Sequence, residues 1–182
     1  LGCPSVSYQY RASASAPTQY VCPSKGIFFG NGTRLTESVA GAGGGGAVSP
    51  TLCSIDMIGT TIANSTTQTK TGDGGAVLLS LDSTLRVDGT STFESNAAAA
   101  GSGGAISCQE CDWMKFKGST KFRLNKAGTS GGAVHLHSSK SPVTSSGTSF
   151  IGNTAVAGDG GAVNSHHSNW TSVGDQLESN VA

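Results

Sequence analysis

Residues 74–106 read GGAVLLSLDSTLRVDGTSTFESNAAAAGSGGAI, and this stretch contains the pattern that decides the fold. It begins and ends with a tetrad, Gly-Gly-Ala followed by Val or Ile, which recurs along the chain at intervals of 29, 29, 28 and 29 residues. The tetrads start at Gly45, Gly74, Gly103, Gly131 and Gly160. Self-similarity at a fixed period of this length is the signature of a repeat architecture.

Two further landmarks keep their order between the tetrads. A Phe-x-x-Asn motif spans Phe93–Asn96, Phe122–Asn125 and Phe150–Asn153, with degenerate copies at 35–38 and 177–180. A glycine also recurs between tetrad and motif, at Gly59, Gly89, Gly118, Gly147 and Gly174. The three landmarks exclude a chance arrangement, and they assign the 27 glycines to ordered structure rather than to a low-complexity segment.

Each repeat reads as three short strands that are joined by turns. In the second repeat these strands are 76–80, 84–87 and 91–95, and Gly89 supplies one of the turns. A strict repeat pairs each strand with its equivalent one coil away, at about 4.8 Å along the axis. We therefore predict an all-β chain, a right-handed parallel β-helix of about five coils, in line with the right-handed preference of parallel crossovers.

Stacking of equivalent residues explains the motifs. We expect an internal aromatic column that is continued by Leu177 and consists of Phe93, Phe122 and Phe150. We expect the asparagines to bond to one another along the axis as an amide ladder of Asn96, Asn125, Asn153 and Asn180. The tetrad glycines should adopt a positive φ or allow a close approach at a corner, which a Cβ would block.

These paired motifs resemble the repeats of the chlamydial polymorphic outer membrane proteins, which are defined by GGA(I/L/V) and FxxN. The resemblance covers residues 35–182 and implies a right-handed β-helix in a surface adhesin. Members of the family are displayed by autotransport, which is not inferred for this chain. Similar repeats also occur in surface proteins of other organisms, so the resemblance does not identify a source. The first full repeat departs from the pattern, because Asn64 falls at the expected Phe position and Thr67 at the expected Asn position.

The two ends of the chain differ from its middle. Residues 1–34 are non-repetitive, and we expect them to form an N-terminal cap on the repeats of 35–182. Cys3 and Cys22 bracket this stretch, so we predict a disulfide between them. At the other end, the sequence stops at Ala182, partway through a sixth repeat. Because an open coil exposes unpaired strand edges, we expect either a continuing chain or head-to-tail stacking of molecules.

Cysteines and glycosylation motifs indicate an oxidising, extracellular compartment. The Asn-x-Ser/Thr acceptors are Asn31, Asn64 and Asn169. Cys108 and Cys111 have the C-x-x-C spacing, but no second C-x-x-C completes a zinc site, so a local disulfide or two reduced thiols are favoured. Cys53 shares a register with Cys111 at about 9.6 Å, too far for a disulfide, so we expect Cys53 to be unpaired or to bond another molecule.

Composition limits the partners. Basic and acidic residues number 11 each, which removes the electrostatic argument for a nucleic-acid partner. No window approaches 18 consecutive apolar residues, so we expect no membrane insertion by this segment. No motif indicates a cofactor. The composition and the motifs together predict a secreted or cell-surface glycoprotein.

A histidine cluster is the candidate metal site. His135, His137 and His166 lie four or six residues after the first glycine of a tetrad, where side chains should point outward. The first two are about 7 Å apart on one strand, and the last two about 4.8 Å apart on neighbouring coils. Three imidazoles in this arrangement can hold Zn²⁺ or Cu²⁺. The alternative is a polar outer face without a ligand, and His167 should point the other way.

Parallel β-helices include polysaccharide lyases and hydrolases, so catalysis has to be considered. Those enzymes need carboxylates on one groove face over adjacent coils. The acidic residues here are scattered, and no Asp pair recurs at one register in neighbouring coils, so we do not expect an enzyme. Trp113 and Trp170 are the candidate aromatics for stacking on sugars, and the glycosylation motif around Trp170 favours its exposure.

The sequence therefore favours a non-catalytic extracellular protein with a structural or adhesive role. Such a protein would be a surface adhesin or a filament subunit. Its partners would be other copies of the chain, stacked head to tail, or a receptor on a host or other cell surface, and glycans are candidate ligands. The alternative is a carbohydrate-binding or polysaccharide-degrading β-helix protein.

Overall fold

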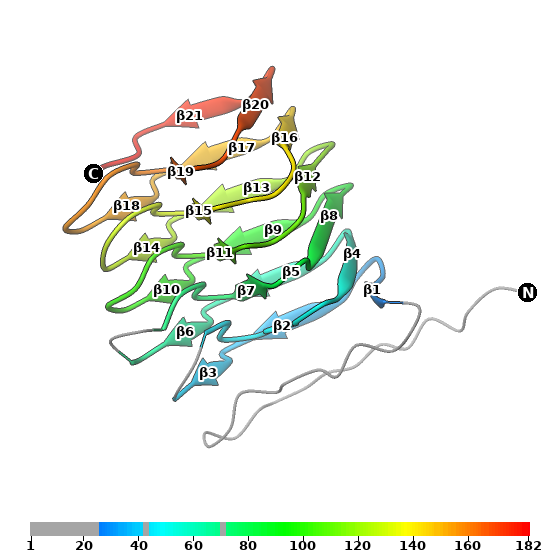
Figure 1. Cartoon of the computed structure of the whole chain (residues 1–182), viewed down its shortest axis with the longest axis horizontal. Coiled ribbons are helices and arrows are strands. Elements are labelled where there is room, and N and C mark those ends of the chain that lie inside the picture. The colour runs from blue at the N-terminus through cyan, green and yellow to red at the C-terminus, as the bar shows by residue number, and fades with distance from the viewer. Residues whose placement is uncertain (1–25, 42–43, 70–71) are drawn as a thin grey trace, which may run out of the picture.

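The computed structural model of the chain describes residues 26–41, 44–69 and 72–182. These residues form a parallel β-solenoid without a helix, and its coils stack in chain order from β1–β3 at one end to β19–β21 at the other (Figure 1). The predicted parallel β-helix of about five coils with a repeat of about 29 residues is confirmed. Most of the predicted cap, with Cys3 and Cys22, lies outside the described residues.

Each full coil passes through four sheets, and each strand pairs in parallel with its equivalent in the next coil. Among the described residues, sheet A contains β1 (Ile27–Phe29), β4 (Ser54–Ile58), β8 (Thr84–Asp88), β12 (Met114–Phe116), β16 (Val143–Ser146) and β20 (Trp170–Val173). Sheet B contains β2 (Arg34–Thr36), β5 (Thr61–Ala63), β9 (Thr92–Glu94), β13 (Lys121–Arg123), β17 (Ser149–Ile151) and β21 (Gln176–Glu178). Sheet C contains β3 (Val39–Ala40), β6 (Thr66–Thr67), β10 (Ala97–Ala98), β14 (Lys126–Ala127) and β18 (Thr154–Ala155). Sheet D contains β7 (Val77–Ser80), β11 (Ile106–Gln109), β15 (Val134–His137) and β19 (Val163–His166).

Two features of this layout differ from the sequence prediction. The prediction gave three strands to a repeat, but a fourth strand of two residues follows each ladder asparagine and builds sheet C. Pairs such as Ala97–Ala98 carry no β-branched or aromatic residue, so propensity gave no signal for them. The solenoid also begins earlier than residue 35, because β1 pairs with β4 inside the range assigned to the cap.

The aromatic column runs through sheet B as predicted. The ring centroids of Phe93 and Phe122 are 4.8 Å apart and those of Phe122 and Phe150 5.0 Å, with interplanar angles of 8° and 3°. These separations follow from the spacing of the coils. The three rings are buried, and such burial stabilises the fold by about 2–3 kcal/mol per ring. Leu177 continues the column in register with Phe150 and is 64% exposed.

The amide ladder is also confirmed. The Asn125 side chain accepts hydrogen bonds at Oδ1 from the backbone N–H and the Nδ2 of Asn96, both at 3.0 Å. Its own Nδ2 donates to Asn153 Oδ1 at 2.9 Å and to the Phe93 carbonyl at 3.0 Å. Asn153 and Asn180 repeat this pattern. The ladder therefore satisfies the buried backbone at the corner between sheets B and C.

The two tetrad glycines have different tasks. The first has a positive φ in each tetrad, for example 68° in Gly103 and 67° in Gly131. The second lies against the next coil, because a Cβ on Gly104 would be 2.2 Å from the Gly132 carbonyl oxygen. Positive φ and close approach were predicted as alternatives, but the first glycine combines both, since a Cβ on Gly103 would be 2.2 Å from the Ile106 carbonyl oxygen, and the second has close approach alone.

The register of the first full repeat corrects the sequence alignment. Ile62 pairs with Phe93, and Ser65 donates its backbone N–H to the Asn96 side chain. Asn64 and Thr67 therefore do not take the Phe and Asn positions. Val48 pairs with Val77 and Ile62 with Phe93, but the segment from Val48 to Ile62 is two residues shorter than its equivalent in the next coil. Two extra residues between Ile62 and Gly74 restore the tetrad spacing. The constant interval between tetrads concealed these compensating changes.

Candidate functional site

The outer face of sheet D carries the predicted histidines. On β15, Val134 and Leu136 point into the core, so His135 and His137 point outward, as strand alternation requires. His137 pairs in register with His166 of β19. His135 pairs instead with Asn164, so the two histidine rungs are not equivalent.

The histidine rings stack rather than converge. The rings of His137 and His166 lie 5.2 Å apart with an interplanar angle of 8°. Because an imidazole binds a metal in its ring plane, two stacked rings present their nitrogens side by side and not to one point. Within residues 26–41, 44–69 and 72–182, no group of three or more His, Cys, Asp or Glu side chains is placed to hold a metal ion. The structure thus does not assemble the predicted metal site of His135, His137 and His166.

His167 was excluded from the predicted cluster but contacts it. Its ring meets that of His166 at 4.0 Å and 73°. The residue has a φ of 50°, a left-handed conformation at the corner after β19. This conformation breaks the alternation of side chains on which the exclusion of His167 depended.

His135 borders a hollow on the same face. The hollow has a volume of about 420 Å³ and is lined by Asp73, Gln109, Glu110, His135 and His137. His135 is partly buried, its Nδ1 has no hydrogen-bond partner, and burial lowers the pKa of its imidazole. The sequence analysis missed the contribution of Asp73, Gln109 and Glu110, which lie one or two coils away from the histidines.

Asp73 supports a loop at the edge of this hollow. Its Oδ1 accepts a hydrogen bond from the Ser102 backbone N–H at 2.6 Å, and its Oδ2 accepts one from Gln109 Nε2. Both oxygens of this carboxylate are therefore engaged in holding neighbouring coils together. Glu110 and His137 are exposed and are free to contact a polar ligand by hydrogen bonds.

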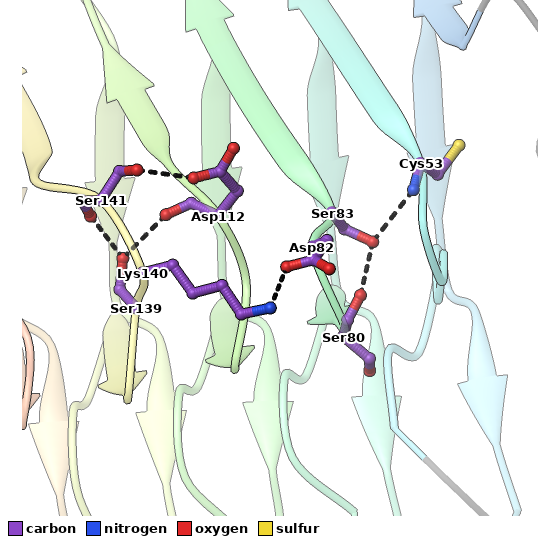
Figure 2. A network of polar contacts seen from close by, with 8 residues as sticks. All are labelled: Cys53, Ser80, Asp82, Ser83, Asp112, Ser139, Lys140 and Ser141. Carbon is purple, nitrogen blue, oxygen red and sulfur yellow. Dashed lines mark hydrogen bonds and ion pairs between the residues drawn. The ribbon is translucent and has the colours of Figure 1, made fainter.

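A polar network joins successive coils at the corner between sheets D and A (Figure 2). Lys140 extends past one coil to form an ion pair with Asp82, which raises the pKa of the lysine. The side chains are 53% and 52% exposed, so the pair adds little stability. Ser141 Oγ donates to Asp112 Oδ1 at 2.6 Å, and Ser83 Oγ accepts the Cys53 N–H at 3.2 Å. These contacts are consistent with a structural corner.

A disulfide closes one of these corners. Cys108 and Cys111 form a local disulfide with their Cα atoms 5.4 Å apart, which was one of the two states left open by the sequence. The hypothesis that Cys53 is unpaired or bonds another molecule is wrong, because Cys53 is disulfide-bonded within this chain. It had been judged only against Cys111, whose partner is Cys108.

The glycosylation motifs and the tryptophans also have defined positions. Asn31, Asn64 and Asn169 are all exposed at turns or strand ends. Trp170 is partly buried and packs on the core, with ring centroids 5.9 Å from Phe116 and 6.1 Å from Phe150. The expectation of an exposed Trp170 is therefore wrong. An exposed asparagine beside it is compatible with an inward tryptophan, since neighbours on a strand face opposite sides.

Comparison with known proteins gives one match. Residues 90–109 match the model of the Chlamydia polymorphic membrane protein repeat. They extend from β9 through the amide ladder and one tetrad to the end of β11, so the match contains both motifs. The resemblance predicted from GGA(I/L/V) and FxxN is thus confirmed over this repeat. Neither the curated proteins nor the solved structures include a match to the chain. No helix in the described part of the chain could cross a membrane.

Proposed function

We propose that this chain acts outside the cell as a non-catalytic surface protein whose solenoid supports adhesion. The observation that carries the proposal is the repetition of the same internal ladders through successive coils. The Phe and Asn positions form the core and the corners, so the outward side chains are free to vary from coil to coil. A rigid support with a variable outer surface suits recognition of another surface.

Two further observations support the extracellular location. The matched repeat is that of a membrane protein family, which fits display at a cell surface. The Cys108–Cys111 disulfide fits an oxidising compartment, and the three exposed glycosylation acceptors fit a secreted chain. The proposal therefore combines a surface location with an adhesive role.

The test is a binding assay with the purified chain. Beads coated with the chain should attach to cultured cells, whereas beads coated with the heat-unfolded chain should not. Sedimentation of the same material should give a single species with the mass of one chain. Equal attachment of both kinds of bead would contradict adhesion. Polymers whose size increases with protein concentration would instead indicate a filament subunit.

The hollow on sheet D favours one alternative, a carbohydrate-binding or polysaccharide-degrading protein. It places Glu110 beside two imidazoles, which are groups that can bind a sugar or transfer a proton. Release of reducing ends from a polysaccharide, abolished in a Glu110→Gln variant, would support this alternative over adhesion.

A further inference from the structure

Five basic residues form a band on the outside of the coil that runs from the tetrad at Gly103 to the tetrad at Gly131. This basic band consists of Lys115, Lys117, Lys121, Arg123 and Lys126. The five side chains are exposed and lie on or beside β12, β13 and β14, so the band extends over sheets A, B and C. The chain has 11 basic residues in all, and no acidic residue occurs between Trp113 and Gly158. A neutral protein thus carries a local concentration of positive charge.

The core explains why these side chains point outward together. Along the same strands, Met114, Phe116, Phe122 and Ala127 are buried. Period-two alternation therefore places every basic residue of the band on the outer surface. Two residues on one strand, such as Lys121 and Arg123, are about 7 Å apart. The band is a row of regularly spaced cations that follows a single coil.

The two borders of the band differ in charge. On the N-terminal side, Arg123 forms an ion pair with Glu94 at 3.4 Å. Asp88 lies near Lys117 and is paired with Arg86, which is in register with Lys115. Among the described residues, the four lysines of the band form no ion pair. On the C-terminal side, three lysines have hydroxyl side chains in register: Thr144 beside Lys115, Ser149 beside Lys121 and Thr154 beside Lys126. Arg123 has Ile151 in register. One border thus offers hydrogen bonds without negative charge.

We propose that the basic band binds a linear anionic polysaccharide, whose sulfate or carboxylate groups contact the lysines while sugar hydroxyls contact the threonine and serine border. Ammonium groups form charge-assisted hydrogen bonds with such anions. Trp113 lies beside the band with Lys115 Nζ 4.9 Å from its ring centroid, and it adds an aromatic surface for a sugar ring. This inference rests on the proposed adhesive function and names the chemistry of the ligand.

The shape of the band argues against other polyanions. It is one coil wide and continues around three sheets, so a flat membrane can touch only part of it. A nucleic-acid duplex places two rows of phosphates on the surface, and the row nearer the N-terminal border would meet Asp88 and Glu94. A single flexible chain can follow the row of cations without reaching that border.

Binding of dextran sulfate, measured by fluorescence anisotropy, tests the inference. The wild-type chain should bind dextran sulfate and not neutral dextran of the same length, and the affinity should fall as salt rises. A variant with Lys115→Gln, Lys117→Gln, Lys121→Gln and Lys126→Gln should bind about tenfold or more weakly. Lys140→Gln, which removes a cation outside the band, should leave binding unchanged. Circular dichroism and thermal unfolding confirm that each variant is folded.

The outcomes separate the inference from the proposed function. Undiminished dextran sulfate binding by the folded fourfold variant would overturn the inference, as would equal affinity for a DNA duplex or for anionic lipid vesicles at the same salt. A polyuronate used beside dextran sulfate tells carboxylate from sulfate recognition. If the variant loses dextran sulfate binding while wild-type beads fail to attach to cells, the band binds glycans and adhesion is wrong. If beads coated with the fourfold variant attach to cells as well as beads coated with the wild type, the adhesive function is supported and the band is not its cause.

Discussion

One asparagine per coil holds a strained corner in place. The residue before each ladder asparagine has a left-handed φ, for example 53° in Ser95 and 54° in Leu124. This conformation costs an L-residue other than glycine about 1 kcal/mol. The asparagine of the next coil offsets the cost: around Ser95, Asn125 accepts from the Asn96 N–H and donates to the Phe93 carbonyl. In Phe-x-x-Asn, the positions therefore encode a core residue, an outward residue, a corner residue and an amide that secures the equivalent corner of the preceding coil.

Replacement of a central ladder residue should be severe. Asn125→Ala removes one hydrogen bond each from the N–H and Nδ2 of Asn96, from the Phe93 carbonyl and from Asn153 Oδ1, all in a buried site. We expect the free energy of unfolding to fall by about 4 kcal/mol. Asn169→Ala, at an exposed position, should change it by less than about 0.5 kcal/mol. Urea denaturation measures both, and a similar small loss in the two variants would contradict a structural ladder.

His135 should make the protein less stable in mild acid. Burial lowers the pKa of its imidazole in the folded state below the ordinary histidine value of 6.5, with Asp73 acting in the opposite direction and His137 in the same direction. Below pH 6.5 the unfolded chain therefore binds the proton first, so stability is complete above this pH and falls as the pH drops towards the folded pKa. Urea denaturation between pH 8 and pH 5 should show a smaller decline in His135→Gln than in the wild type. At pH 8 the imidazole is neutral in both states, and an identical decline in both proteins would refute the role of His135.

Among the strands and corners, the second tetrad glycine should tolerate substitution least. Gly104 has no left-handed φ, but a Cβ there would lie 2.2 Å from the Gly132 oxygen and 2.6 Å from the Lys126 backbone. Gly104→Ala must separate two coils, and we expect a loss of more than about 3 kcal/mol. Gly147 has a φ of 66° and its Cβ would meet only the Gly118 oxygen at 3.3 Å, so Gly147→Ala should cost about 1 kcal/mol. Thermal unfolding measures the loss of stability in both variants. A larger loss in Gly147→Ala than in Gly104→Ala would show that a positive φ constrains these glycines more than close contact with the next coil does.

The sequence predicted those elements whose signal lies in a repeated side chain. The Phe column, the Asn ladder and the turn glycines such as Gly118 recur at matching positions, so their stacking followed from the period alone. Sheet C was missed because each of its strands has only two residues, too few for a periodic pattern, and their pairing comes from the neighbouring coils. The position of Ile62 was missed because two compensating length changes left the tetrad interval unchanged.

At the scale of the whole molecule, the candidate site was harder to predict than the fold. Register placed His137 beside His166, but ring orientation decides whether nitrogens converge, and a repeat period contains no information about it. The hollow combines Asp73 with His135, which lie 62 positions apart in the sequence. The charges of the basic band were visible in the sequence, but the overall net charge of zero concealed them.

The stacked arrangement predicts a gradient of stability along the axis. A solenoid is held by contacts between neighbouring coils, so a coil with neighbours on both sides opens less often than one with a single neighbour. Strands β9 and β13 are paired on both sides, whereas β21 pairs only with β17 and all its residues are exposed. Amide hydrogen exchange of this chain should therefore be fastest in β21, slower in β17 and slowest in β9 and β13.

A ladder variant connects this gradient to a defined contact. Asn153 bonds Asn180 on one side and accepts from Asn125 on the other. Asn153→Ala should therefore speed exchange in β17 and β21 by tenfold or more, since about 1.4 kcal/mol corresponds to a factor of ten. Protection in β5 and β9 should change little, because these strands lie on the far side of β13. A uniform loss of protection in all strands would instead mean that the solenoid unfolds as one cooperative unit, and that its coils are not independent neighbours.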